Sequence, residues 1–228
     1  MKEFISYLSK YTSLLKEGSV WCNSNEILAP VINDKDEGVA SDNYIYEFYC
    51  YISIIVDLMS KYDIEFVEGT GKFKYKFPQA ATEKKGKPRF NALKNGKLEF
   101  QICAGTKVSC EFGSEENHPD ISFQLPGSTD NPTQDDLIFI MDAKYKEGPK
   151  SVLPKSEVYK FGMIVILFNL RSSPAIEVKF TKYNELKGNC LLTNGQSYSN
   201  SSDISYLKKF SIKEVESFFP GSTFKVLG

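Results

Sequence analysis

The chain has 228 residues, which is enough to bury one sizeable core without disulfides or metals and corresponds to one or two domains. Its 28 Lys and Arg and 29 Asp and Glu give a formal net charge of −1, which excludes a binder that depends on bulk positive charge. The single histidine, His118, excludes two-histidine zinc sites and leaves one ring for any Ser-His-Asp triad.

The N-terminal part of the chain favours helices. Apolar residues at helical spacing predict a helix over 3–16, followed by a connecting loop over 18–41. A long helix is expected over about 42–61, because one continuous apolar stripe runs along it. The stripe consists of Ile45, Phe48, Tyr49, Ile52, Ile55, Val56 and Met59.

Hydrophobicity then alternates with a period of two from residue 64 to residue 144, which is typical of strands. The segment Leu137–Met141 is apolar on both faces, which places it inside the sheet. A turn-rich loop over 126–136 precedes it. Strands are expected near 73–77, 98–102, 108–112, 121–123 and 137–141.

Helices and a strand are expected in the last third of the chain. Residues 156–170 predict a mostly buried helix, and 175–181 alternate as in a strand. The capping box from Ser211 to Glu214 predicts a last helix that ends near Phe219. This order of elements indicates an α/β domain with a mixed central β-sheet flanked by helices.

The cysteines and the apolar runs bear on the compartment. Between Met1 and Gly18, charged residues interrupt any secretory apolar core, and the longest apolar run, 161–168, is too short to span a membrane. The cysteines lack metal-ligand spacing, so we expect them to be reduced and mostly buried in a cytoplasmic protein without a membrane partner. They are Cys22, Cys50, Cys103, Cys110 and Cys190.

Two acidic positions mark neighbouring strand ends. Asp120 enters one predicted strand, and Asp142-Ala143-Lys144 ends the next, with a separation that suits a hairpin with a long loop. Alternation puts Asp142 and Lys144 on one face, while the Ala143 carbonyl can face a metal. Two carboxylates and a carbonyl suit Mg²⁺ or Mn²⁺, and a nearby lysine suits metal-assisted phosphodiester hydrolysis. The alternative is a surface ion pair at a strand end.

Glu47 interrupts a second apolar face of the long helix, formed by Tyr51, Ile54 and Leu58. A buried carboxylate is costly unless it is paired or bound to a metal. Glu47 is therefore a further candidate metal ligand, directly or through a water molecule. The alternative is a helix-edge glutamate in solvent. His118 is expected to cap a turn rather than to bind metal, because no second histidine is available.

This arrangement resembles the PD-(D/E)xK nuclease superfamily, which has the restriction-endonuclease-like fold. The resemblance implies that Asp120 and Asp142 bind Mg²⁺, with Mn²⁺ as a possible substitute, and that Lys144 orients or activates the attacking water. The superfamily often has a glutamate on the helix before the sheet, which Glu47 matches. It often has a Gln or Lys on the helix after the motif, which Lys160 matches, although lysines near a helix start are common.

The resemblance extends to one group within the superfamily. Tyr46-Glu47-Phe48-Tyr49-Cys50 and Lys144-Tyr145-Lys146 are similar to segments of the nuclease subunit of McrBC-type modification-dependent restriction systems. The resemblance covers about residues 42–181 and implies that they form the nuclease core. Residues 1–41 are then an N-terminal helix with a connecting loop, and 182–228 are a C-terminal extension packed on the core.

Charge is unevenly distributed along the chain. Residues 72–97 contain nine basic residues and one acid, whereas 111–136 contain seven acids and no Lys or Arg. The basic stretch is a candidate contact for a DNA backbone, and the alternative is an ordinary solvated hairpin. The predicted nucleic-acid contacts are Lys72, Lys74, Lys76, Lys84, Lys85, Lys87, Arg89 and Lys146.

The leading hypothesis is therefore a Mg²⁺-dependent endonuclease that acts on DNA in restriction or anti-phage defence, with a homodimer possible. The alternative is a non-catalytic nucleic-acid-binding or assembly subunit on a nuclease fold. A third possibility is a nuclease that stays silent until a signalling ligand or a partner NTPase activates it. The chain contains no Walker-type phosphate-binding motif, so such an NTPase would be a separate protein.

Overall fold

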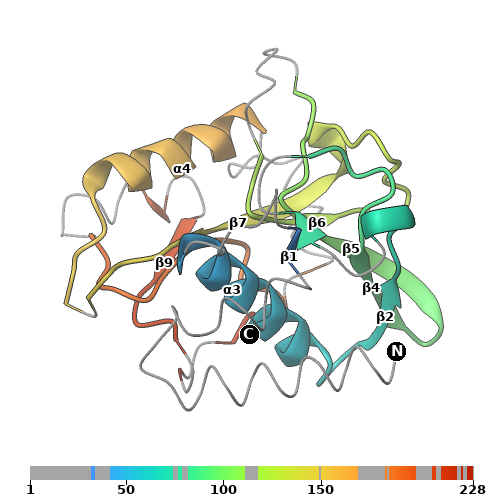
Figure 1. Ribbon diagram of the computed structural model, residues 1–228, viewed down its shortest axis with the longest axis horizontal. Coiled ribbons are helices and arrows are strands. Elements are labelled where there is room, and N and C mark those ends of the chain that lie inside the picture. The colour runs from blue at the N-terminus through green and yellow to red at the C-terminus, as the bar shows by residue number, and fades with distance from the viewer. Residues whose placement is uncertain are drawn as a thin grey trace.

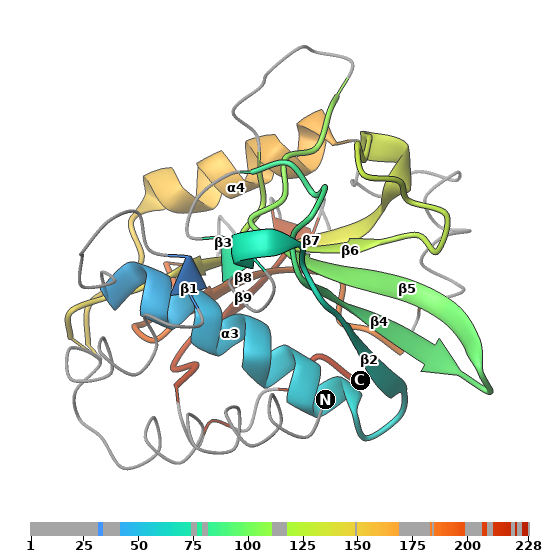
Figure 2. The same cartoon turned by 45° about the vertical axis from the view of Figure 1, so that its right-hand side comes forward.

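A mixed sheet of seven strands forms the centre of the described structure, and one helix covers each of its faces (Figure 1, Figure 2). The computed structural model describes residues 32–33, 42–73, 77–78, 82–110, 118–148, 150–168, 183, 185–198, 207–208, 212–219, 222 and 225–227. The helices and strands are β1 (Ile32–Asn33), α3 (Asp42–Leu58), β2 (Asp63–Val67), β3 (Phe77–Pro78), β4 (Arg89–Lys94), β5 (Lys97–Ala104), β6 (Ile121–Gln124), β7 (Leu137–Lys144), α4 (Lys155–Leu167), β8 (Asn189–Thr193) and β9 (Ile212–Val215).

The sheet has the strand order β2-β4-β5-β6-β7-β8-β9. In this sheet β2, β4, β5, β6 and β7 pair antiparallel, whereas β7, β8 and β9 pair parallel, so the sheet is mixed. The predicted α/β class with a mixed central sheet flanked by helices is confirmed, and the architecture is consistent with a restriction-endonuclease-like core. The predicted interior position of Leu137–Met141 is also confirmed, because β7 lies between two strands and all five of these residues are buried.

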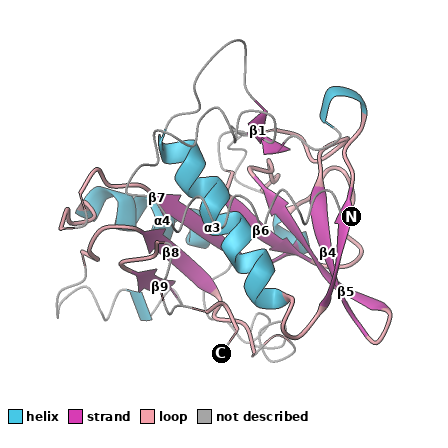
Figure 3. Cartoon of the chain, turned by 60° about the horizontal axis from the view of Figure 1, so that its bottom comes forward, coloured by secondary structure: helices cyan, strands magenta, loops and turns pink. Residues whose placement is uncertain are grey.

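Helix α3 crosses one face of the sheet diagonally and builds the larger core (Figure 3). Its residues Phe48, Ile52 and Ile55 are buried against this face, as the apolar stripe predicts. The predicted burial of the stripe is wrong at its C-terminal end, because Val56 and Met59 are 47% and 51% exposed. The buried surface instead turns toward the second apolar face of Tyr51, Ile54 and Leu58, and the helix ends at Leu58.

Helix α4 packs on the opposite face and builds a second core. Val158, Phe161 and Val165 of the helix lie against Ile140 of β7 and Leu191 of β8. The predicted helix over 156–170 is confirmed in its described part, 155–167, but the prediction that it is mostly buried is wrong, because Tyr159 and Met163 are 40% and 54% exposed. In the part of the chain that the structure describes, no helix combines the length and apolar character needed to cross a bilayer.

The predicted last helix over 211–219 is wrong. Residues Ile212–Val215 form β9, which pairs parallel with β8. Ile212 packs into the core beneath α4, whereas Val215 packs into the core beneath α3. Residues three apart can lie on one face of a helix, but in this strand Ile212 and Val215 lie on opposite faces of the sheet. The Glu214 carboxylate accepts the Tyr198 N–H at 3.1 Å.

Two further expectations need correction. Residues Gly71–Phe73 form a 3₁₀ turn rather than the start of a strand over 73–77. Among the described residues near this segment, Phe77–Pro78 pair with β1, which lies inside the predicted loop 18–41. The sheet also continues past residue 181, since β8 and β9 belong to it. Part of the segment 182–228 is therefore built into the core rather than packed on it. The predicted helix 3–16 and strand 175–181 lie outside the described residues.

The four cysteines that the structure describes are free, as expected. Cys50, Cys103 and Cys190 are buried, and Cys110 is partly exposed. Cys22 lies outside the described residues. The buried thiols lie in the apolar interior, where burial raises the pKa of Cys190 to about 12.

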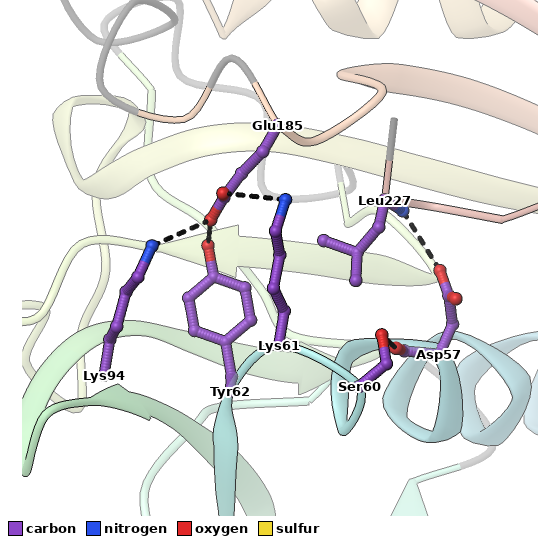
Figure 4. Close-up of polar contacts among 7 residues, drawn as sticks. All are labelled: Asp57, Ser60, Lys61, Tyr62, Lys94, Glu185 and Leu227. Atoms are coloured by element: carbon purple, nitrogen blue, oxygen red, sulfur yellow. Dashed lines mark hydrogen bonds and ion pairs between the residues drawn. The ribbon is translucent and has the colours of Figure 1, made fainter.

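The C-terminal end of α3 is tied to two distant segments (Figure 4). The Asp57 carboxylate accepts the N–H groups of Val226 at 2.7 Å and Leu227 at 3.0 Å. The Ser60 hydroxyl donates to the Asp57 carbonyl oxygen. Nearby, the side chains of Lys61, Tyr62 and Lys94 converge on the carboxylate of Glu185. The hydrogen bond from Tyr62 and the charges of both lysines hold the pKa of Glu185 below its usual value.

Replacing Glu185 with glutamine is expected to flatten the acid side of the stability profile. The lowered pKa means that Glu185 contributes stability above the ordinary glutamate pKa of about 4.3, and this contribution is lost as pH falls through the folded-state value. Urea unfolding between about pH 6 and pH 3 measures the effect. Glu83→Gln, at an exposed loop position, is the matched control. An equal loss of stability with falling pH in wild type and Glu185→Gln contradicts the prediction.

Candidate active site

The pairing of β6 with β7 brings the two predicted aspartates together. Ile121 lies opposite Met141 in this antiparallel pair, so the next residues along the sheet, Asp120 and Asp142, face each other at its end. The predicted hairpin is thus confirmed. Ala143 packs into the core beneath α3, and Lys144 alternates back to the side of Asp142.

Lys144 joins the two aspartates into one cluster. Its Nζ lies 2.7 Å from Asp142 Oδ2 and 3.9 Å from Asp120 Oδ2. Asp120 Oδ2 also accepts the N–H of Ala143 at 2.7 Å, which fixes the carboxylate of one strand to the backbone of the other. Asp142 is 6% exposed and the side chain of Lys144 is 27% exposed, so water screens this ion pair only weakly.

Glu47 belongs to the same cluster, although it comes from α3. Burial, with a smaller contribution from the charge of Asp142, raises its pKa to about 8, although the ammonium of Lys144 acts in the opposite direction. The structure therefore places Glu47 within electrostatic reach of Asp142 and Lys144 and not in open solvent. This position agrees with its predicted place on the second apolar face of the helix.

The two aspartates are electrostatically unequal. Burial raises the pKa of Asp120 well above its usual value, and the charges of Asp142 and Glu47 add to this. Burial also opposes ionisation of Asp142, but the hydrogen bond with Asp120 and the ammonium of Lys144 outweigh it and lower its pKa. In the metal-free protein, Asp142 is thus the ionised partner of Lys144, and Asp120 more readily holds a proton.

The cluster has the donor chemistry for a hard divalent cation. Glu47, Asp120 and Asp142 supply three carboxyl groups against the single ammonium of Lys144, and the raised pKa values of Glu47 and Asp120 come first from burial and then from this excess of acid. Asp120 and Asp142 are the residues that would hold Mg²⁺, with Glu47 binding directly or through water. Among the described residues, no group of three or more His, Cys, Asp or Glu side chains is arranged so that it could hold a metal ion.

Lys160 is not brought into this cluster. It is exposed on α4, and its Nζ pairs with Glu157 Oε1 of the same helix at 3.2 Å. Glu157 is the α4 residue that acts on the site, and sequence reasoning missed it. Burial lowers the pKa of Lys144, but Asp142 and Asp120 outweigh burial and raise it, and Glu157 adds a smaller contribution. Its position in the first turn of α4, three residues before Lys160, is the sequence feature that could have identified it.

His118 also lies near the cluster. It is partly buried two residues before Asp120, and its charge contributes to the lowered pKa of Asp142. Sequence reasoning favoured a turn cap for this residue. The structure places it where it can influence the ionisation of a candidate metal ligand.

The predicted nucleic-acid contacts divide into several groups. Lys84 is only 2% exposed, and its ammonium donates to the carbonyl and the hydroxyl of Ser128, so this residue is a buried structural lysine and not an open contact. Lys85 is exposed, Arg89 and Lys146 are partly buried, and the Lys87 ammonium lies 2.9 Å from the ring centre of Phe73. The side chains of Lys72, Lys74 and Lys76 lie outside the described residues.

Asn194 is a positioning residue that the sequence did not reveal. Its Oδ1 accepts the N–H of Lys146 at 2.7 Å, and its Nδ2 donates to the carbonyl of Lys146 at 2.7 Å. This buried amide follows β8 and binds the chain two residues after Lys144. It therefore helps to fix the end of β7 that carries the cluster.

The cluster presents carboxylates of the kind that bind hard cations, and beside them an ammonium of the kind that stabilises charge on a phosphate oxygen. These groups come from β6, β7 and α3, with Glu157 of α4 and Asn194 in support. Comparisons of the chain with protein-family models, with curated proteins and with solved structures find no match.

Proposed function

We propose that this protein is a Mg²⁺-dependent endonuclease that hydrolyses DNA phosphodiester bonds, in restriction or anti-phage defence. The observation that carries the proposal is the contact of the Lys144 ammonium with Asp142 at 2.7 Å and with Asp120 at 3.9 Å, within electrostatic reach of the partly buried Glu47. An ion pair of purely structural use does not require three neighbouring carboxyl groups, two of which have raised pKa values.

Each residue has a separate role in this proposal. Asp120 and Asp142 bind Mg²⁺, which when bound supplies a Lewis acid for the phosphoryl oxygen and lowers the pKa of water. Lys144 orients the attacking water and faces the negative charge that develops on the phosphate. Glu47 completes the acidic set, and the Ala143 N–H holds the Asp120 carboxylate in place.

Cleavage of a supercoiled plasmid tests the proposal. The wild-type protein is expected to cut with Mg²⁺ or Mn²⁺ and to stop with EDTA. Lys144→Ala is expected to cut about 100-fold more slowly, because it loses the ammonium beside the reacting phosphate. Lys208→Ala, at an exposed position away from the cluster, is the control and should cut at the wild-type rate.

The other outcomes identify different functions. If Lys144→Ala cuts as fast as wild type, the mechanism is wrong. Salt-dependent DNA binding without metal-dependent cleavage, unchanged in Asp142→Asn, identifies a non-catalytic binding or assembly subunit. Cleavage that begins only when a separate NTPase or ligand is added retains the nuclease and assigns its control to that partner.

A further inference from the structure

A cavity of about 450 Å³ is lined in part by the residues that directly follow Lys144 in the chain. Its size falls within the range of about 300–1,000 Å³ that is typical of small-ligand sites. Several of its lining residues are exposed, so it opens to solvent. The cavity is lined by Asn43, Tyr145, Lys146, Glu147, Ser151 and Val152.

The walls of this cavity continue from the two elements that carry the cluster. Tyr145 and Lys146 directly follow Lys144 at the end of β7. Asn43 lies on α3 four residues before Glu47, which is about one helical turn. A phosphate at the cluster would therefore have its adjoining nucleoside next to this cavity.

The lining has the chemistry of a nucleotide site. The Tyr145 ring lies 6.1 Å from the Tyr46 ring at an angle of 51°, so a buried aromatic residue supports the cavity wall. Lys146 makes no ion pair with a described carboxylate, which leaves its ammonium available for a phosphate. Asn43 and Ser151 supply an amide and a hydroxyl for hydrogen bonds to a base or sugar.

The wall is also held in place before any ligand binds. The Asn194 amide bonds both backbone groups of Lys146 at 2.7 Å. Gly195 lies beneath this wall, because a Cβ there would come within 2.3 Å of the Ser151 carbonyl oxygen and 2.9 Å of Lys146 Cγ. Pre-organisation of this kind reduces the entropy lost when a ligand binds.

We infer that this cavity binds one unstacked nucleotide of the substrate, so that the DNA is single-stranded or locally unpaired where it is cut. The inference rests on the proposed function and adds the substrate class. A base that enters the cavity must leave the stack of a duplex, which costs least when it is already unpaired. Tyr145 offers a ring for the base, and Lys146 offers a charge for its phosphate.

Binding of fluorescent oligonucleotides tests this inference, with Ca²⁺ in place of Mg²⁺ so that no turnover is needed. A single strand is expected to bind at least about ten-fold more tightly than the fully paired duplex of the same sequence. Tyr145→Leu is expected to weaken single-strand binding by about 5- to 100-fold, through lost stacking, without changing duplex binding. Tyr145→Phe should bind as wild type, and Tyr159→Leu, at an exposed tyrosine on α4, is the control.

A second variant keeps the test independent of folding. Lys146→Met is expected to reduce the slope of log affinity against log salt by about 0.7, which a general loss of folded protein does not change. Equal affinity for single strand and duplex, or an unchanged salt slope in Lys146→Met, overturns the inference. Single-strand preference without any metal-dependent cleavage contradicts the proposed nuclease and leaves the nucleotide site standing. Rapid cleavage of paired DNA without single-strand preference retains the proposed nuclease and contradicts the nucleotide site.

Discussion

Replacing Asp142 with asparagine is expected to lower the rate of metal-dependent DNA cleavage about 1,000-fold and to destabilise the metal-free protein. The rate falls because one of the two carboxylates that hold the cation loses its charge. The stability falls because Lys144 loses its 2.7 Å partner and retains only Asp120 at 3.9 Å. Loss of a hydrogen bond to a charged group costs about 2 kcal/mol of unfolding free energy.

Asp120→Asn is the matched variant, and its effect on stability is expected to have the opposite sign. Cleavage should fall by a similar factor, since the second carboxylate is lost. The metal-free protein should become more stable by about 1 kcal/mol, because the substitution removes the cost of burying an ionisable carboxyl group, to which the charges of Asp142 and Glu47 add. The asparagine oxygen can still accept the Ala143 N–H.

Urea unfolding in EDTA, followed by circular dichroism, measures both stabilities, and plasmid cleavage measures both rates. The pair separates a metal site from a structural ion pair. If the cluster only stabilised the fold, neither variant would change cleavage beyond the loss of folded protein. Stability changes of the same sign in both variants contradict the electrostatic inequality of the two aspartates.

The centre of the site could be predicted from the sequence because it depends on local rules. Side-chain alternation puts Asp142 and Lys144 on one side of β7, and an antiparallel hairpin puts Asp120 beside them. Glu47 could be found because it interrupts an apolar face of α3. Each of these signals lies within one element or between two neighbours in the chain.

The failures involve contacts between distant parts of the chain. Ser211 and Glu214 have the spacing of a helix cap, but pairing with β8 and burial on both sides of the sheet make this segment a strand. Lys84 belongs to a basic stretch, yet its ammonium is buried and donates hydrogen bonds to Ser128, which is far away along the chain. Local propensity and charge patterns carry no information about such partners.

Asn194→Ala is expected to affect stability and cleavage together, since this residue connects the fold to the site. The variant leaves the N–H and the carbonyl of Lys146 without their 2.7 Å partners. Two unpaired backbone groups in a partly buried position cost about 1–3 kcal/mol of unfolding free energy. The chain two residues after Lys144 then moves, and a displacement of about 1 Å near the reacting groups can lower a rate about 100-fold.

Two further variants separate positioning from general destabilisation. Asn194→Asp keeps the acceptor for the Lys146 N–H, but it loses the donor to the carbonyl and buries a carboxylate against that oxygen, so its stability should not exceed that of Asn194→Ala. Asn131→Ala, at an exposed loop position, should match wild type. Cleavage is measured at a temperature where every variant is folded by circular dichroism. The kcat is expected to decrease in the order wild type, Asn194→Asp, Asn194→Ala, because the variants lose one and then both hydrogen bonds. A wild-type kcat in folded Asn194→Ala would show that the amide stabilises the protein without positioning the end of β7.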